Sequence, residues 1–269
     1  MRNTAPERAD FEALFAAHGV PAIEYLRAHY PRFVATKRHF LETRGRTKGH
    51  RVLDIGAHWL HQSLLYAIDG FEVVALDLPF TFELENVRNL AAAHAITLVP
   101  EPDLEHARAF AAIPDSSIDI VLFTEIIEHI TFNPVAMWRE VHRVMKPGAR
   151  IVVTTPNYYA LRGRAWNWLR FLRGFGGGLP SRDILTMHTG AHHWKEFALG
   201  ELLAYFRALS PDFVFTKALR LPRFDRGPAS RRVPAKRMIE ALVPVLRPNL
   251  HVEIELATKE HGIVVSPRW

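Results

Sequence analysis

The stretch RVLDIGAHWLHQSLLYAIDGFEVVALD, residues 51–77, decides the fold. A short apolar run at each of its ends flanks an amphipathic segment at 60–69, which is the pattern of a strand, a helix and a second strand. An acidic residue lies at or near the end of each run, Asp54 in the first and Asp77 in the second. Strands joined through a helix pair in parallel, so both carboxylates are expected at the carboxyl edge of one sheet, where ligands bind in doubly wound folds.

The same alternation of apolar runs and amphipathic stretches continues along the chain. Strands are predicted at 51–55, 71–77, 96–99, 118–124, 149–155, 213–219 and 251–258, and helices at 60–69, 81–94, 104–110, 133–145, 197–209 and 235–246. Helical spacing at 10–44, punctuated by Pro21 and Pro31, adds an N-terminal helical arm. These elements predict an α/β fold, a Rossmann-like, doubly wound and mostly parallel seven-stranded sheet with helices on both faces.

The predicted organisation is a helical arm or lid at 1–48, followed by one α/β domain at 49–269 that carries insertions at about 158–193 and 217–248. The chain has 269 residues and a net charge of +6. Of these residues 48% are hydrophobic and 23% are charged, as in a globular protein. The absence of cysteine excludes thiol nucleophiles, disulfides and cysteine–zinc sites. No long apolar run is present, which favours a cytoplasmic protein, with peripheral contact at the inner face of the membrane as an extension.

Asp54, Gly56 and Asp77 form the candidate cofactor edge. A glycine after the first strand lets the backbone approach a ligand, and an acid about twenty residues later accepts hydrogen bonds from ribose hydroxyls in nucleotide-binding folds. A helix-capping Asp54 and a turn-forming Asp77 are the structural alternative.

Four motifs, in order and at the right spacing, are VLDIGAHWLHQS, VVALD, IPDSSIDIVLFTEIIEHI and HRVMKPGARIVVTTPN. Together they resemble the class I S-adenosylmethionine (SAM)-dependent methyltransferases over about 51–157. The resemblance implies that Asp54 and Gly56 border the methionine part of SAM, that Asp77 holds its ribose, and that Asp103 with Leu104 frames its adenine. The chain departs from the family at the loop glycines, because His58 and Leu60 stand where two further glycines are usual. Bulky side chains there are expected to change the loop path or to point away.

A carboxylate and histidine cluster follows the fourth strand. In TEIIEHI, Glu125, Glu128 and His129 have helical spacing, so a helix would present all three on one face. Such a set suits a divalent cation, Mg²⁺ or another metal. The pattern is similar to the ubiquinone-pathway O-methyltransferases and to the small-RNA 2′-O-methyltransferases. That resemblance implies Glu125, Glu128, His129 and His192 as metal ligands, with His193 replacing His192 if the register slips by one; a metal-free crevice wall is the alternative.

His129 and His192 are the candidate catalytic residues. An acceptor hydroxyl must lose its proton before it can attack a methyl group, and either a neutral histidine or a bound metal can promote this loss.

Residues 158–178 interleave aromatic and arginine side chains, among them Trp166 and Trp168. This pattern suits a membrane interface, stacking on nucleic acid, or a lid whose aromatic rings pack on the core. The basic run 217–237 raises RNA as a partner, but no RNA-binding module is recognisable there, which favours a solvated loop.

The sequence therefore predicts a SAM-dependent O-methyltransferase acting on a hydroxyl of a small-molecule, glycan or lipid-linked acceptor. The bacterial glycan and small-molecule methyltransferases end their fifth strand with a similar TPN. An RNA 2′-O-methyltransferase that uses a divalent metal is the first alternative. A non-catalytic, methyltransferase-like binding module is the second, since the loop has lost two glycines.

Overall fold

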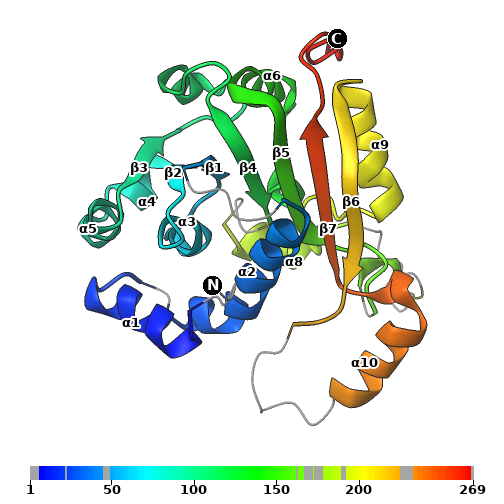
Figure 1. Cartoon of the computed structure of the whole chain (residues 1–269). Helices are drawn as coiled ribbons and strands as arrows, with labels where there is room; N and C mark the ends of the chain where they lie inside the picture. The colour runs from blue at the N-terminus through cyan, green and yellow to red at the C-terminus, as the bar shows by residue number, and fades with distance from the viewer. Residues whose placement is uncertain are drawn as a thin grey trace.

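A computed structural model of the chain describes residues 6–21, 23–44, 49–161, 163–166, 172, 178–188, 192–224 and 233–267 (Figure 1). In chain order the elements are α1 (Arg8–Ala17), α2 (Ile23–Arg44), β1 (Arg51–Ile55), α3 (His61–Ala67), β2 (Glu72–Asp77), α4 (Pro79–Phe82), α5 (Glu85–Ala93), β3 (Ile96–Pro100), η1 (Arg108–Ala112), β4 (Ile118–Thr124), η2 (Ile127–His129), α6 (Val135–Val144), β5 (Met145–Pro156), η3 (Arg164–Trp166), α8 (Ser181–Thr186), α9 (Leu199–Leu209), β6 (Phe213–Leu221), α10 (Val233–Leu242), η5 (Pro244–Leu246) and β7 (Asn249–Leu256).

The seven strands form one sheet in the order β3-β2-β1-β4-β5-β7-β6. The first five strands pair in parallel, and β7 is antiparallel to both β5 and β6. This confirms the predicted doubly wound, mostly parallel sheet. The carboxyl ends of β1, β2, β4 and β5 consequently meet at one edge, the lower edge in Figure 1, and α2 crosses in front of it.

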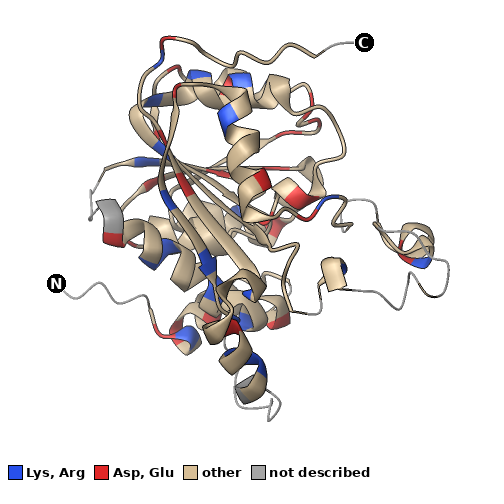
Figure 2. Cartoon of the chain, turned by 90° about the vertical axis from the view of Figure 1, so that its right-hand side faces the viewer, with Lys and Arg blue, Asp and Glu red and all other residues tan. Residues whose placement is uncertain are grey.

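Alternate side chains of the strands build two separate cores. Leu53, Val121 and Phe123 face α6 and α9, whereas Val52 and Leu122 face the side that carries α1, α2, α3 and α5. A turn of 90° shows helices to both sides of the strands (Figure 2). Both faces are covered, and the central strands β1 and β4 are accordingly buried almost without interruption.

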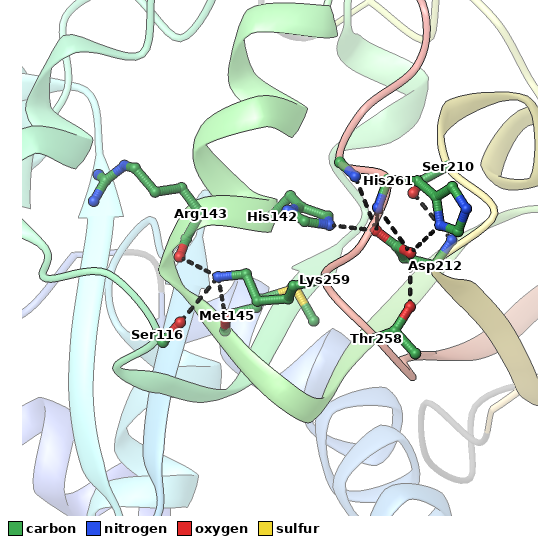
Figure 3. Close-up of polar contacts among 10 residues, drawn as sticks. Ser116, His142, Arg143, Met145, Ser210, Asp212, Thr258, Lys259 and His261 are labelled. Carbon is green, nitrogen blue, oxygen red and sulfur yellow. Dashed lines mark hydrogen bonds and ion pairs between the residues drawn. The ribbon is translucent and has the colours of Figure 1, made fainter.

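The segment after β7 is fastened at the amino edge of the sheet by two sets of polar contacts, one around Asp212 and one around Lys259 (Figure 3). Asp212 is 1% exposed and its carboxylate accepts hydrogen bonds from Thr258 Oγ1 at 2.7 Å, from the backbone N–H groups of His261 and Gly262, and from the side chains of His261 and His142. Lys259 Nζ donates to the carbonyls of Arg143 and Met145, at 2.8 and 3.0 Å. Lys259 thus adds a donor to carbonyls at the junction of α6 and β5, where the helix offers them no partner of its own.

Three sequence predictions of local structure were wrong. Pro31 lies inside α2 and does not interrupt it; buried Tyr30 and Phe33 on either side hold the helix in place against the cost of the missing backbone N–H. The predicted helix at 104–110 is instead the short 3₁₀ turn η1. It cannot extend toward its N-terminus because Ala107 has a φ of +51°.

The predicted helix at 81–94 is likewise divided into α4 and α5. None of the helices in the described ranges is both long and apolar enough to cross a bilayer.

Candidate active site

The loop after β1 keeps a glycine-like path without the glycines. Gly56 has a φ of +77°, and His58 and Leu60 also take positive values, +50° and +67°. For a side-chain-bearing residue the left-handed region costs about 1–2 kcal/mol. Leu60 is fully buried in the core beside α3, and the His58 ring lies against Trp59 with centroids 3.6 Å apart and the planes tilted by 35°. The backbone therefore turns as glycines would allow, while the two bulky side chains point into packing positions.

Gly56 is the position in this loop that admits no side chain. A Cβ added there would overlap Cδ1 of Ile126 and come within 2.7 Å of its Cγ1. The backbone of Gly56 is fixed by its N–H, which donates to Leu76 O at 2.8 Å. The β1 loop and the turn after β4 are thus in direct contact at the centre of the crevice edge.

Gly56→Ala is expected to lower the free energy of unfolding by about 2–4 kcal/mol, combining left-handed strain with overpacking. Gly148→Ala is the matched control, because Gly148 also has a φ of +77° but nothing lies within 4 Å of an added Cβ. The control should lose only the strain, about 1 kcal/mol. Urea denaturation of the two variants measures the difference, and equal losses would show that Ile126 imposes no packing limit.

Asp77 ends β2 with acceptor positions to spare. Its Oδ2 accepts the N–H of His58 at 2.5 Å and its Oδ1 accepts the N–H of Leu78 at 2.6 Å. A carboxylate offers about four acceptor positions, so two hydrogen bonds leave room for ribose hydroxyls. Burial raises the pKa of Asp77, although these two hydrogen bonds act in the opposite direction.

Asp54 lies deeper in the fold. It is 1% exposed and its Oδ2 accepts a hydrogen bond from Ser63 Oγ at 2.6 Å. Burial raises the pKa of Asp54 to about 7, and the charge of Asp77 adds to the effect of burial. The hydrogen bond from Ser63 thus links the end of β1 to the start of α3.

The predicted adenine residues follow β3. Asp103 is exposed, and its carboxylate contacts the His106 ring at 2.5 Å and accepts the N–H of Glu105 at 3.1 Å. Leu104 is half-buried and packs on the core. In the same turn the buried Glu101 holds the N–H groups of Asp103 and Ala109.

The segment after β4 is not the helix that the spacing of Glu125, Glu128 and His129 suggested. Glu125 has a φ of +58°, and only Ile127–His129 forms a 3₁₀ turn. Glu125 Oε2 pairs with Arg32 Nη1 of α2 at 2.9 Å, while Oε1 is buried without a hydrogen-bond partner. The left-handed residue directs Glu125 toward the N-terminal helices, so it is not grouped with the other two side chains.

Glu128 is fully buried at the crevice. Its Oε2 accepts a hydrogen bond from Thr155 Oγ1 at 2.9 Å, and its Oε1 has no hydrogen-bond partner. Burial, followed by the nearby charge of Glu125, raises the pKa of Glu128 well above its usual range. The backbone carbonyl of Glu128 accepts the N–H of Trp194 at 2.7 Å, which brings the segment after residue 191 against η2.

His129 has a defined tautomer. Its Nδ1 lies 3.0 Å from the carbonyl oxygen of His192, and since a carbonyl can only accept, Nδ1 carries the hydrogen. Burial lowers the pKa of His129, which keeps the ring neutral at pH 7. Nε2 is then an unprotonated nitrogen, the form that a general base requires.

His193, and not His192, joins this cluster. One ligand atom from each of Glu128, His129 and His193 lies within 4.8 Å of the other two, close enough for one ion. The ring of His192 is buried and its Nε2 donates to Asp183 O at 2.9 Å, on the side of α8. The alternative register that the sequence left open is therefore the one that the geometry favours.

Helix α2 supplies an aromatic wall over the β1 loop. The Tyr25 ring stacks on His61 with centroids 5.7 Å apart, and its edge meets His58 and Trp59. Burial lowers the pKa of His61 to about 3, so the wall stays uncharged. The N-terminal helices and the cofactor edge thus form one continuous surface.

Arg32 and Asn157 are polar residues of the crevice that the sequence analysis did not identify. Arg32 lies 93 residues before its partner Glu125, and no local pattern signals such a contact. Asn157 follows β5 and is 2% exposed; its Nδ2 donates to the carbonyls of Val245 and Arg247 at 2.8 and 2.7 Å. The TPN that ends β5 was its only sequence signal.

Much of the predicted acceptor segment 158–178 lies outside the described residues, including Trp168, Arg170, Phe171 and Arg173. Trp166 is half exposed, and its Nε1 donates to Tyr159 O at 3.1 Å. Arg164 forms an ion pair with Glu196, with 3.3 Å between Nε and Oε1.

Comparisons with known proteins place these features in a family. A family described as "Methyltransferase domain" matches residues 26–204. A ubiquinone biosynthesis O-methyltransferase of Xanthomonas oryzae pv. oryzae is 28% identical over 162 residues, which cover 59% of this chain and 61% of that protein. The alignments with the curated relatives span between 40% and 67% of those proteins' own length.

Solved structures share the fold. A methyltransferase in complex with the Haloferax volcanii Trm112 methyltransferase activator has a TM-score of 0.56 at 15% identity, covering 93% of this chain and 98% of that one. A SAM-dependent methyltransferase from Mesorhizobium loti has a TM-score of 0.53 at 20% identity, covering 85% and 97%.

Proposed function

Since the chain belongs to the class I SAM-dependent methyltransferases, we propose that it transfers a methyl group from SAM to a hydroxyl of a small-molecule, glycan or lipid-linked acceptor. One observation carries the choice of oxygen as the acceptor atom. His129 presents an unprotonated Nε2 at the carboxyl edge of the sheet, with Nδ1 fixed by the carbonyl of His192. A base so placed serves an acceptor that must lose a proton as it attacks.

The cofactor edge supports SAM binding. Asp77 retains acceptor positions suited to ribose hydroxyls, and Gly56 brings bare backbone to the edge next to Asp54. When bound, SAM supplies an electrophilic methyl group on a sulfonium. Asp103 and Leu104 at the adenine end stay a prediction from the family resemblance.

The chemical step needs little from the protein beyond position and proton transfer. His129 Nε2 takes the acceptor proton, and the hydrogen bond from Nδ1 to the carbonyl of His192 stabilises the charged ring that results. His192 then acts through its backbone. We propose the helical arm at 1–48 as the cover of the crevice, supported by the ion pair between Arg32 and Glu125.

A metal-assisted version is the second candidate. Glu128, His129 and His193 offer one carboxylate and two imidazoles, and Glu128 Oε1 is a buried oxygen without a hydrogen-bond partner. This donor set suits Mn²⁺, Fe²⁺ or Zn²⁺ better than Mg²⁺, which prefers oxygen ligands. A bound cation would lower the pKa of a coordinated acceptor hydroxyl, and an RNA 2′-hydroxyl is then the second acceptor class.

The test combines calorimetry with SAM and transfer of labelled methyl to fractions of a cell extract, with mass spectrometry of the product. We expect heat on SAM binding and a labelled product whose new methyl is on oxygen. Unchanged transfer in excess chelator supports His129 as base, whereas loss that Mn²⁺ or Zn²⁺ restores supports the metal-assisted version. No SAM binding at all would support the non-catalytic module, and methyl on nitrogen or carbon would overturn the proposed acceptor.

A further inference from the structure

Helix α10 buries an acidic side chain and exposes apolar side chains, unlike an ordinary surface helix. Glu240 points inward and is fully buried, where its Oε2 accepts the N–H of Arg223 at 3.1 Å. On the outside, the side chains of Met238 and Leu242 are 61% and 76% exposed. Helices of water-soluble proteins normally turn their apolar face to the core. The outward apolar face of α10 therefore lacks a described partner within the chain.

The exposed apolar surface continues past the end of the helix. Val243 and Val245 are 41% and 39% exposed, and Ile239 is 38% exposed on the same element. Arg247 fixes this turn, because its Nε donates to Glu240 O at 3.0 Å and its Nη1 to Arg220 O at 3.2 Å. We call the side chains of Met238, Ile239, Leu242, Val243 and Val245 the α10 face.

Positive charge accompanies this apolar surface. Arg237 is exposed and Lys236 is half-buried on the same helix. Figure 2 shows α10 at the lower end of the molecule, mostly tan with blue on one side. Apolar side chains flanked by lysine and arginine are the composition of helices that lie in the interface of an anionic membrane.

The α10 face lies near the acceptor side of the crevice. In Figure 1, α10 projects below the sheet at the edge where β5 and β6 end. Asn157 joins the two regions, because its side chain holds the carbonyls of Val245 and Arg247 just after β5. The N–H of Leu161 donates to Leu246 O at 3.0 Å. The α10 face and the end of β5 are therefore one connected structure.

We propose that the α10 face binds the surface of an anionic lipid bilayer. The charge complementarity favours this occupant over a second copy of the chain, because a twofold contact through α10 would bring Lys236 and Arg237 of both copies together. It also favours lipid over nucleic acid, because the face consists of aliphatic and thioether side chains and offers no aromatic ring for stacking on bases.

The position of this surface narrows the acceptor class. If the proposed methyl transfer holds, on which this part rests, the acceptor is a lipid-linked hydroxyl compound that enters the crevice from the bilayer surface. Binding to the bilayer does not depend on methyl transfer, so the two proposals fail separately.

Vesicle flotation of the full chain tests the inference. The probes are vesicles of phosphatidylglycerol mixed with phosphatidylcholine and vesicles of phosphatidylcholine alone. We expect the protein to float with the anionic vesicles and to bind neutral vesicles at least about tenfold more weakly. Leu242→Glu should lower binding to the anionic vesicles by at least about tenfold, because a carboxylate replaces the most exposed side chain of the α10 face.

Val264→Glu is the matched control. Val264 is 55% exposed and belongs to the C-terminal segment at the opposite edge of the sheet, so the same charge change there should leave flotation unchanged. Equal losses in both variants, or no flotation of the unaltered protein, would overturn the proposal. Sedimentation of a dimer that Leu242→Glu dissociates, without flotation, would assign the face to a second copy instead. Calorimetry with SAM, done without vesicles, reports on the proposed function separately.

Discussion

Replacing His129 with alanine is expected to lower the rate of methyl transfer about 10²- to 10⁴-fold, the usual contribution of a positioned general base. SAM affinity should change little, because the proposed cofactor contacts come from the β1 loop and the end of β2. The pKa of His129 is lowered by burial. The neutral ring is therefore present at pH 7, and the rate should fall only as the pH drops through that lowered value.

His94→Ala is the control for this experiment. Burial also lowers the pKa of His94, but His94 lies at the end of α5, near the opposite edge of the sheet. The control variant should keep the full rate with the labelled-methyl assay. A His129→Ala variant that retains the full rate would contradict the assignment of His129 as base or ligand. A fall in SAM affinity equal to the fall in rate would assign His129 to cofactor binding instead.

Replacing Asp212 with alanine is expected to lower the free energy of unfolding by about 3–5 kcal/mol, the usual cost of removing one partner of a buried charged network. The change leaves His142, Thr258 and two backbone N–H groups without their acceptor (Figure 3). Asp115→Ala is the control, because Asp115 pairs with Arg143 at the surface and is mostly exposed. That variant should lose about 1 kcal/mol or less in urea denaturation.

Asp212 also predicts a direction of pH dependence. Burial alone would raise its pKa, but hydrogen bonds from His261, Thr258 and His142 outweigh burial and hold the pKa well below its usual value. A carboxyl group with a lowered pKa in the folded state stabilises the fold above its unfolded pKa, about 4, and loses this contribution as the pH falls below it. The unaltered protein should thus lose more stability than Asp212→Ala as the pH falls from about 5 to about 2, a range that includes the unfolded pKa of aspartate. Parallel pH profiles would contradict this role.

The strands could be predicted closely because burial on both faces leaves a strong apolar signal. The predicted 51–55 and 118–124 coincide with β1 and β4. Breaks within helices were harder to predict. Pro31 is a local signal against a helix, and it was overruled by the packing of α2 on the sheet, which depends on residues distant in sequence.

The site could be predicted in part. The position of Asp77 at the end of β2 follows from strand spacing alone, and the structure places its carboxylate at the edge where the β1 loop turns. The ion pair of Glu125 with Arg32 could not be predicted from the spacing, because a left-handed residue replaces the expected helix and Arg32 lies 93 residues earlier. The choice of His193 over His192 depends on the hydrogen bonds of Trp194 and Lys195 to Glu128 O, which join segments more than sixty residues apart.

The contacts of α2 also constrain how the chain can fold during its synthesis. His39 accepts a hydrogen bond through its carbonyl oxygen from Lys217 Nζ, 178 residues later, and its ring lies 5.6 Å from that of His251. Helix α2 is therefore completed by strands β6 and β7, which the ribosome makes much later. A nascent chain whose strands β6 and β7 are still inside the ribosome lacks these two contacts of His39. Because such distant contacts form slowly, α2 can close fully over the sheet only after β6 and β7 have left the ribosome.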